Sequence, residues 1–429
     1  MTKCSRLQLA AVLFATLLAA GPAIGGGGEL VAVDSKETSL DATGTTSDTM
    51  ATSSDAGLGR FQDLPFHVTV SVRGGYDDNV FTSRQNPQES AFTNASIGLS
   101  YEFGNARTQL TLATGGGLTY YFDIGSDDDV DLNAYVALNV THRATPRLSF
   151  TANVYASYQV EPDFALGLGL NRRGAGYFIT NDRFSLTYLW TPRFSTLTHY
   201  TFSALAYDDD DVAFYEDRFE NTIGNEFRFL LWPTTTVLAE YRFQVISYDE
   251  IERDSTSHFA LAGFDHSLNP RFNASFRGGA QFRHYEDFLG LGEADVTEPY
   301  FEGTFRYAMG KRTSIAWVNR YGIEEPDVAG SRSRITFRTG LQARHNITPR
   351  IAAGLGLYYQ HDENEGSNAG IFSTPGFDEE SFDLALTVRY AVTRYFAIDA
   401  GYNHTEVWSD IFLREYSRNR YFAGASLTF

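Results

Sequence analysis

The chain of 429 residues contains one cysteine, three lysines and 12 prolines. The cysteine, Cys4, lies in an apolar leader, so the rest of the chain can form no disulfide bond. No later run of 18 apolar residues occurs, which argues against helical membrane spans. The formal net charge is −19, the opposite of the basic surface that nucleic-acid-binding proteins present.

Motifs that carry catalysis or hold metal ions are also missing. The nine histidines are scattered, with no His-Glu-x-x-His pair and no glycine loop placed to bind phosphate. His199 and His404 could act as bases in a hydrolase, but no recognisable serine or aspartate set accompanies them. Carboxylates gather at 77–78, 127–129 and 208–211, without the spacing of a calcium loop, and are interpreted as a solvated acidic rim. The sequence predicts no enzyme, no metal site and no cofactor.

What the chain does contain is a short motif that recurs eight times, a breaker or small polar pair usually followed by Arg. The steps between the third positions of successive copies range from 37 to 46 residues. A period of about 40 residues indicates a repeated supersecondary unit. The copies are Asn105-Ala106-Arg107, Thr145-Pro146-Arg147, Thr191-Pro192-Arg193, Trp232-Pro233-Thr234, Asn269-Pro270-Arg271, Gly310-Lys311-Arg312, Thr348-Pro349-Arg350 and Val392-Thr393-Arg394.

Polar and apolar residues alternate between these motifs. In residues 66–73, Phe and three Val alternate with His, Thr, Ser and Arg, and residues 334–342 and 382–389 follow a similar pattern. A period of two places the two sets on opposite faces of a β-strand. The alternating segments run about 10–14 residues, which is near the length of a tilted membrane-crossing strand and longer than most strands of soluble proteins.

Two such strands fit each repeat. Eight short turns join eight pairs, and one further strand at each end brings the expected total to about 18. Short periplasmic turns and longer extracellular loops are typical of outer-membrane barrels. The expected fold is therefore all-β: a transmembrane, antiparallel, up-and-down β-barrel. A soluble β-sandwich or propeller is the less favoured alternative; propeller blades have a similar period but pack four short strands into it. The longer loops are expected at 76–91, 122–130, 160–175, 208–217, 249–254, 285–297, 324–332, 362–379 and 409–418.

The chain divides into three predicted parts. Residues 1–23 have the charged start, apolar segment and small residues of a secretory signal peptide. Residues 24–60 are rich in Gly, Ser, Thr, Asp and Ala and are expected to form a flexible periplasmic segment. Residues 61–429 are the predicted barrel. Its last strand places Tyr421, Leu427 and Phe429 at alternating positions, which resembles the C-terminal signal that barrel-assembly machinery recognises.

Charged residues occur at many positions of the face that is expected to point into the barrel. Charges are costly in lipid unless they face protein or water, so these residues predict a polar lumen. Their guanidinium groups could guide anionic or sugar solutes, and cross-strand pairing with carboxylates is an alternative that is compatible with this role. The candidate pore-lining residues are Arg73, Arg228, Arg242, Arg277, Arg306, Arg338, Arg344, Arg389, Glu226, Glu240, Glu302 and Asp383.

The seven residues Gly75, Tyr76, Asp77, Asp78, Asn79, Val80 and Phe81 follow the N-terminal segment and open the barrel. With this motif and a terminal Phe, the chain resembles the "putative β-barrel porin 2" family over about residues 60–429. The resemblance implies a large outer-membrane barrel. Some members of that family are linked to exopolysaccharide export.

The expected function is an outer-membrane channel for hydrophilic solute, with secreted exopolysaccharide as the cargo that the resemblance favours. A general or sugar-selective diffusion porin is one alternative, and a plugged structural barrel that binds at the surface is another. The expected partners are outer-membrane lipid and lipopolysaccharide, the barrel-assembly machinery and, through the resemblance, periplasmic polysaccharide-export components. No nucleic-acid partner is expected, and the sequence leaves the oligomeric state open.

Overall fold

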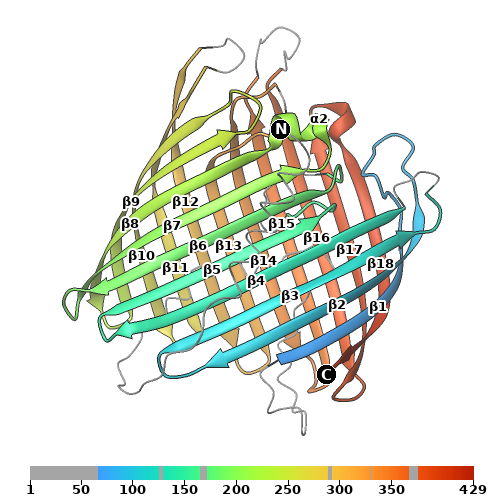
Figure 1. Ribbon diagram of the computed structural model, residues 1–429, viewed down its shortest axis with the longest axis horizontal. Coiled ribbons are helices and arrows are strands. Elements are labelled where there is room, and N and C mark those ends of the chain that lie inside the picture. The colour runs from blue at the N-terminus through green and yellow to red at the C-terminus, as the bar shows by residue number, and fades with distance from the viewer. Residues whose placement is uncertain (1–65, 125–128, 165–171, 288–291, 329, 367–374) are drawn as a thin grey trace. The chain divides into compact units, whose positions relative to one another are not determined.

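The computed structural model describes residues 66–124, 129–164, 172–287, 292–328, 330–366 and 375–429. The predicted signal peptide and flexible segment therefore lie outside the described residues. Eighteen strands make up nearly all of the described chain (Figure 1). They are β1 (Phe66–Asp77), β2 (Ser90–Gly104), β3 (Thr108–Tyr121), β4 (Val130–Thr145), β5 (Leu148–Gln159), β6 (Tyr177–Leu189), β7 (Phe194–Tyr207), β8 (Arg218–Trp232), β9 (Thr235–Tyr248), β10 (Ser255–Asn269), β11 (Phe272–Tyr285), β12 (Ala294–Met309), β13 (Thr313–Glu324), β14 (Arg334–Asn346), β15 (Ile351–Asn364), β16 (Phe377–Ala391), β17 (Phe396–Ser409) and β18 (Tyr416–Thr428).

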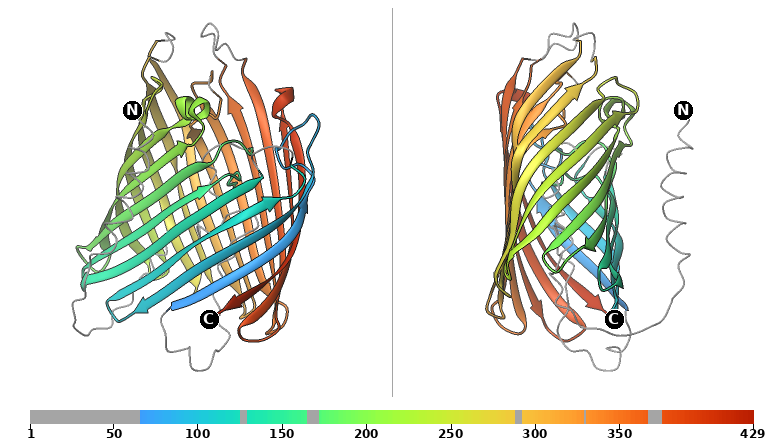
Figure 2. Two further views of the ribbon diagram at one scale, coloured as in Figure 1. Left: turned by 45° about the vertical axis from the view of Figure 1, so that its right-hand side comes forward. Right: turned by 90° about the vertical axis from the view of Figure 1, so that its left-hand side faces the viewer.

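Every strand pairs antiparallel with the strand before and after it in the chain. The ring closes where β1 pairs with β18, from Thr69 opposite Thr428 to Asp77 opposite Arg420. Figure 2 shows β1 in blue beside β18 in red. The prediction of an 18-stranded, antiparallel, up-and-down barrel is thus confirmed, and closure leaves no strand edge unpaired.

A Thr or Asn at the first position of the recurring motif caps the short turn in five of its eight copies. The Thr145 hydroxyl accepts hydrogen bonds from the backbone N–H groups of Arg147 (3.2 Å) and Leu148 (3.0 Å). Thr191 and Thr348 do the same, and Asn105 does so through its side-chain oxygen. Because such side chains offer the backbone a local partner, they favour turns over continued strand.

The last copy of the motif is displaced by one residue. Aligned on its Arg, this copy reads Val392-Thr393-Arg394, but the capping hydroxyl belongs to Thr393, which accepts from the N–H groups of Tyr395 and Phe396. The position of the cap, and not that of the Arg, therefore defines the turn.

The opposite end of the barrel carries the nine longer connections. One of them contains the short helix α2 (Asp210–Glu216), which packs beside β7 (Figure 1). The Asp209 side chain caps this helix by accepting from the N–H groups of Asp211 and Val212. The connection before β18 contains a single 3-10 turn, η2 (Phe412–Arg414). Among the described residues, no helix is long and apolar enough to cross a membrane.

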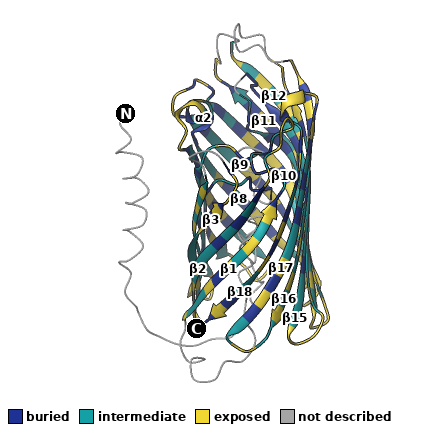
Figure 3. Cartoon of the chain, turned by 90° about the vertical axis from the view of Figure 1, so that its right-hand side faces the viewer, coloured by how far each residue is buried: buried dark blue, intermediate teal, exposed yellow. Residues whose placement is uncertain are grey.

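The two faces of the strands differ in exposure, as the alternation predicts. On the outer face apolar side chains such as Val72, Ile97 and Ile223 are more than half exposed. Figure 3 shows buried and exposed residues following one another along the strands. The inner face holds the buried charged residues described below. An apolar exterior around a charged interior reverses the arrangement of a soluble β-protein.

Candidate functional site

Ion pairs between strands that are not neighbours show which side chains point into the barrel. Arg242 of β9 donates from Nη1 to Glu302 of β12 at 3.1 Å, although β10 and β11 lie between these strands. Arg228 of β8 reaches Asp265 of β10 at 2.5 Å across β9. Only side chains on the concave face can make such contacts, and cross-strand neighbours share a face.

All twelve candidate pore-lining residues lie in strands, on the face that these contacts and the register place inside. The register joins them in rows, for example Arg73 opposite Gly424, which in turn lies opposite Asp399. That solute passes them stays a prediction. They are Arg73 (β1), Glu226 and Arg228 (β8), Glu240 and Arg242 (β9), Arg277 (β11), Glu302 and Arg306 (β12), Arg338 and Arg344 (β14), and Asp383 and Arg389 (β16).

Half of these residues belong to two groups of ion pairs on β8 to β12, one around Glu226 and one around Arg242. Glu226 accepts from Arg228 at 2.9 Å and lies 3.5 Å from Arg277. Asp265 lies 2.5 Å from Arg228 and 2.6 Å from Arg277, and so links them. Buried charges of opposite sign stabilise one another where water is excluded, so this part of the wall is a paired structural network.

Sequence reasoning missed Asp265, the residue that joins this network. Its inner-face neighbours on β10 are Phe259 and Leu261, which are buried and pack with Tyr300. This part of the inner face is apolar, whereas the inner face of most strands is polar. The alternation of the sequence alone therefore does not show which face of β10 points into the barrel. The register against β9, in which Leu261 lies opposite Glu240, resolves it.

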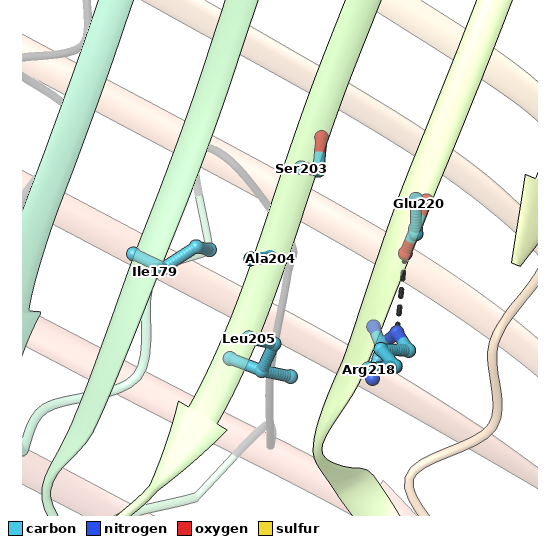
Figure 4. A pocket seen from close by; sticks show the side chains of 6 residues that line it. All are labelled: Ile179, Ser203, Ala204, Leu205, Arg218 and Glu220. Atoms are coloured by element: carbon cyan, nitrogen blue, oxygen red, sulfur yellow. Dashed lines mark hydrogen bonds and ion pairs between the residues drawn. The ribbon is translucent and has the colours of Figure 1, made fainter. Parts of the chain in front are cut away.

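A second apolar patch lies on the inner wall where β6, β7 and β8 meet. Ile179, Ala204 and Leu205 line a small pocket with the ion pair between Arg218 and Glu220 (Nε to Oε1, 3.1 Å) (Figure 4). Its volume of about 10 Å³ is enough for about one water molecule. The pocket is therefore a packing defect of the wall, too small to be a solute site.

His199, Glu226 and Glu240 meet on the inner wall, each with a possible ligand atom within 4.8 Å of the others. No metal site is predicted from the sequence, where the cluster cannot be seen because each of its residues comes from a different strand. Glu226 is ion-paired with Arg228, and Glu240 with Arg242. Guanidinium groups this close oppose the binding of a further cation, so the three residues are best explained as part of the ion-pair network.

At the end with the longer loops, a first loop is fixed to a strand of the wall that is not its neighbour. Glu161, just after β5, accepts from Arg418 of β18 at 2.5 and 3.0 Å and lies 3.5 Å from Arg420. Burial alone would raise the pKa of Glu161, but these two guanidinium groups hold it well below its usual range. Since four strands separate β5 from β18, this contact crosses the interior.

A second loop, between β13 and β14, is fixed at two places, to β11 on one side and to η2, before β18, on the other. Glu325 accepts from Arg283 of β11 at 2.5 Å. Asp327 accepts from Arg414 of η2 at 2.7 Å, and Arg414 also binds Glu379 of β16 at 2.7 Å. We call these contacts and the pairing of Glu161 with Arg418 the mouth tethers.

The two tethered loops lie near each other. Burial alone would raise the pKa of Asp327, but Arg414 and Arg334 hold it well below its usual range, and Arg172 of the first loop adds to this effect. The described parts of both loops therefore reach across the mouth and narrow it. Sequence reasoning located both loops but missed these tethers, since nothing local distinguishes Glu161 or Asp327 from solvated loop acids.

The family-like motif forms the seam where the barrel closes. Asp77 is fully buried and accepts from Arg418 at 2.6 Å, and Asp78 accepts from the backbone N–H of Asn419 at 2.6 Å. Asn79 donates to the Ser417 carbonyl group at 2.9 Å. The interpretation of these acids as a solvated rim is wrong for Asp77, because the ring closure brings Arg418 to it from the far end of the chain.

The residues of the predicted assembly signal lie on the outer face. Tyr421, Leu427 and Phe429 are each more than 40% exposed, and the backbone of Phe429 pairs with Val68 in both directions at 2.8 and 3.1 Å. The last strand is thus both the closing strand and an apolar outer surface. Its recognition by the assembly machinery stays a prediction.

A closed 18-stranded barrel with an apolar exterior, a charged inner wall and loops narrowing one end defines a porin-like barrel of the bacterial outer membrane, which the chain crosses many times. The model of the family described as "Putative beta-barrel porin 2" matches residues 65–429, and the chain belongs to this family. The resemblance seen in the motif at 75–81 is therefore confirmed.

Among solved structures, the vanillate-bound OpdK of Pseudomonas aeruginosa is 12% identical, and the match covers 85% of this chain and 99% of that one at a TM-score of 0.43. OccAB4 of Acinetobacter baumannii is 10% identical, with 86% and 100% covered and a TM-score of 0.41. At these values the similarity carries no argument about function. No curated protein matches the sequence.

Proposed function

We propose that the protein is an outer-membrane channel for hydrophilic solute and that its cargo is exported exopolysaccharide. One observation carries the channel part: the inner wall holds charged side chains on seven strands, among them Arg73 (β1), Glu226 (β8) and Asp383 (β16). Charged groups at membrane depth require water or polar partners, and barrels of 16 to 18 strands are wide enough for an aqueous channel unless loops fill them.

The mouth tethers favour restricted passage over general diffusion. Asp327 and Glu161 hold two loops across the mouth through buried charge-assisted hydrogen bonds. A general diffusion porin needs a mouth that stays open to any small solute. Tethered loops fit a channel that opens for one kind of cargo, and they also support the alternative of a plugged surface barrel.

Planar-bilayer recording of the refolded protein tests the channel. We expect discrete conductance steps, with rare openings at neutral pH because of the mouth tethers. If the refolded protein inserts but never conducts, and variants without the tethers do not conduct either, the channel proposal is wrong. The plugged barrel then remains. Rapid swelling of liposomes in small neutral sugars would instead identify a diffusion porin.

The cargo is proposed from the family resemblance and needs a separate test in cells. We expect a strain without the protein to retain polymer in the periplasm and to recover secretion when the chain is restored. Unchanged extracellular polymer in the deleted strain would overturn this part of the proposal alone.

A further inference from the structure

A hollow opens on the inner wall near the end with the short turns. It lies on the neighbouring strands β14 to β18 and β1, and its volume is about 50 Å³. We call it the arginine hollow. The side chains that matter for its chemistry are Arg73, Arg344, Arg389, Asp399 and Phe422.

One of its three guanidinium groups is already paired. Arg73 of β1 reaches across β18 and binds Asp399 of β17 from Nε at 2.7 Å, while its guanidinium group lies 5.2 Å from the centre of the Phe422 ring. The residue that it crosses is Gly424, where a Cβ atom would collide with the Arg73 side chain. The glycine therefore lets Arg73 lie flat against the wall and neutralise Asp399.

The other two guanidinium groups lack such a partner. Arg344 and Arg389 make no hydrogen bond or ion pair with any residue that the structure describes. Arg389 lies within electrostatic range of Asp399, Arg73 and Arg344. Three arginines less one aspartate leave a net charge of +2 in the hollow.

This arrangement differs from that of the inner wall on strands β8 to β12. On β8 to β12, Arg228, Arg242 and Arg277 each lie against at least one carboxylate. Neighbouring like charges without counterions are unfavourable, and they persist where an anion can neutralise them. Gly354, opposite both Arg344 and Thr387, has no side chain to fill the space.

We propose that the arginine hollow binds a carboxylate group of the passing solute, and that the solute is an acidic saccharide of the uronic-acid kind. Two guanidinium forks match the paired oxygens of carboxylates, and the hollow has room for one such group but not for a whole sugar ring. Lipid headgroups cannot reach the inner face. The saccharide part rests on the proposed channel function, whereas carboxylate binding does not.

Isothermal titration calorimetry of the full chain, folded in detergent at low salt, tests the site with sodium glucuronate. We expect glucuronate to bind, glucose not to bind and acetate to bind more weakly. The double variant R344Q/R389Q should lose about 100-fold in affinity, about tenfold for each guanidinium group. The control R312Q/R350Q removes two charges from exposed turns at the same end and should leave affinity unchanged. R344K/R389K, which keeps the charge without the fork, should bind with intermediate affinity.

Three results would overturn the inference: equal glucuronate affinity in the wild type and in R344Q/R389Q, equal binding of glucose, or binding of inorganic phosphate that is as tight and as sensitive to these substitutions. If acetate binds as tightly as glucuronate, the proposal that the ligand is a saccharide is wrong, and the proposal that the hollow binds a carboxylate group stands. Conductance of the same samples tests the proposed channel function separately from the binding of carboxylate in the arginine hollow. Folding of each variant is checked by heat-modifiable migration on gels, so that a loss of binding is not a loss of the barrel.

Discussion

Replacing Asp327 with Asn tests whether the tethers close the mouth. The buried carboxylate accepts from Arg414 at 2.7 Å, and Arg414 keeps two bonds to Glu379 at 2.7 and 3.0 Å when this contact is weakened. The substitution therefore removes one charge-assisted hydrogen bond without leaving an unpaired guanidinium group, and it should cost about 2 kcal/mol. That free energy corresponds to about a 30-fold larger open population of the loop.

Cysteine labelling can measure this population directly. Apart from Cys4 the chain has no cysteine, so Ser331→Cys places a single thiol in the tethered loop, at a side chain that is fully buried. In a background with Cys4 removed, Asp327→Asn should speed maleimide labelling about 30-fold, because labelling follows opening. Asp295→Asn, at a carboxylate that is 85% exposed at the same end, is the matched control and should change nothing.

The lowered pKa of Asp327 sets the pH range over which the tether acts. Because the folded-state pKa of Asp327 lies below its unfolded value, the tether contributes stability at pH values above the unfolded pKa and loses it only as pH falls through the folded pKa. The ratio of the labelling rate in Asp327→Asn to that in the parent protein isolates the tether and should thus be constant from about pH 5 to pH 8. Equal labelling rates in the parent and in Asp327→Asn would refute the tether.

Three further predictions concern stability. Gly75→Ala should cost about 1–3 kcal/mol in urea unfolding, because its Cβ would collide with the Tyr421 carbonyl group and the Phe92 ring, whereas Gly104→Ala meets nothing and serves as the control. Ile223→Arg, on the outer face, should destabilise the barrel by about 2–4 kcal/mol and Thr222→Arg, on the inner face, by much less; equal effects would reverse the assigned faces. Burial raises the pKa of Glu216 in α2 to about 7, although Arg253 and Arg218 act to lower it. Because the folded-state pKa lies above the unfolded one, the free energy of unfolding should fall by roughly 2–3 kcal/mol from pH 5 to pH 8. Glu216→Gln should remove this slope, and a parent profile that is flat over this range contradicts the assignment.

The strand count and the turn positions could be read from the sequence because both depend on local chemistry. Alternation has a period of two wherever one face is apolar, and a Thr or Asn hydroxyl or amide oxygen caps a turn within three residues of itself. The one displaced motif, at Thr393, shows the limit of pattern alignment: Arg recurs there, but the hydrogen-bonding side chain decides the turn.

The contacts of the inner wall could not be read in the same way. Arg242 and Glu302 are 60 residues apart, and Arg418 and Asp77 are 341 apart. Such pairs depend on the register of several intervening strands and on ring closure, neither of which leaves a local signal. The sequence could therefore place Arg344 and Arg389 on the inner face, but not show that neither of them forms an ion pair with a described carboxylate.

By itself the sequence determined a membrane barrel, its number of strands, the end that carries the short turns and the face that carries the charges. These properties follow from periodicity and turn chemistry, which act over a few residues. Only the tertiary structure decided which charges are paired, that Asp77 is buried, that two loops are tied across the mouth and that the arginine hollow stays open. Each of these depends on side chains brought together across the interior, and distance through space is independent of distance along the chain.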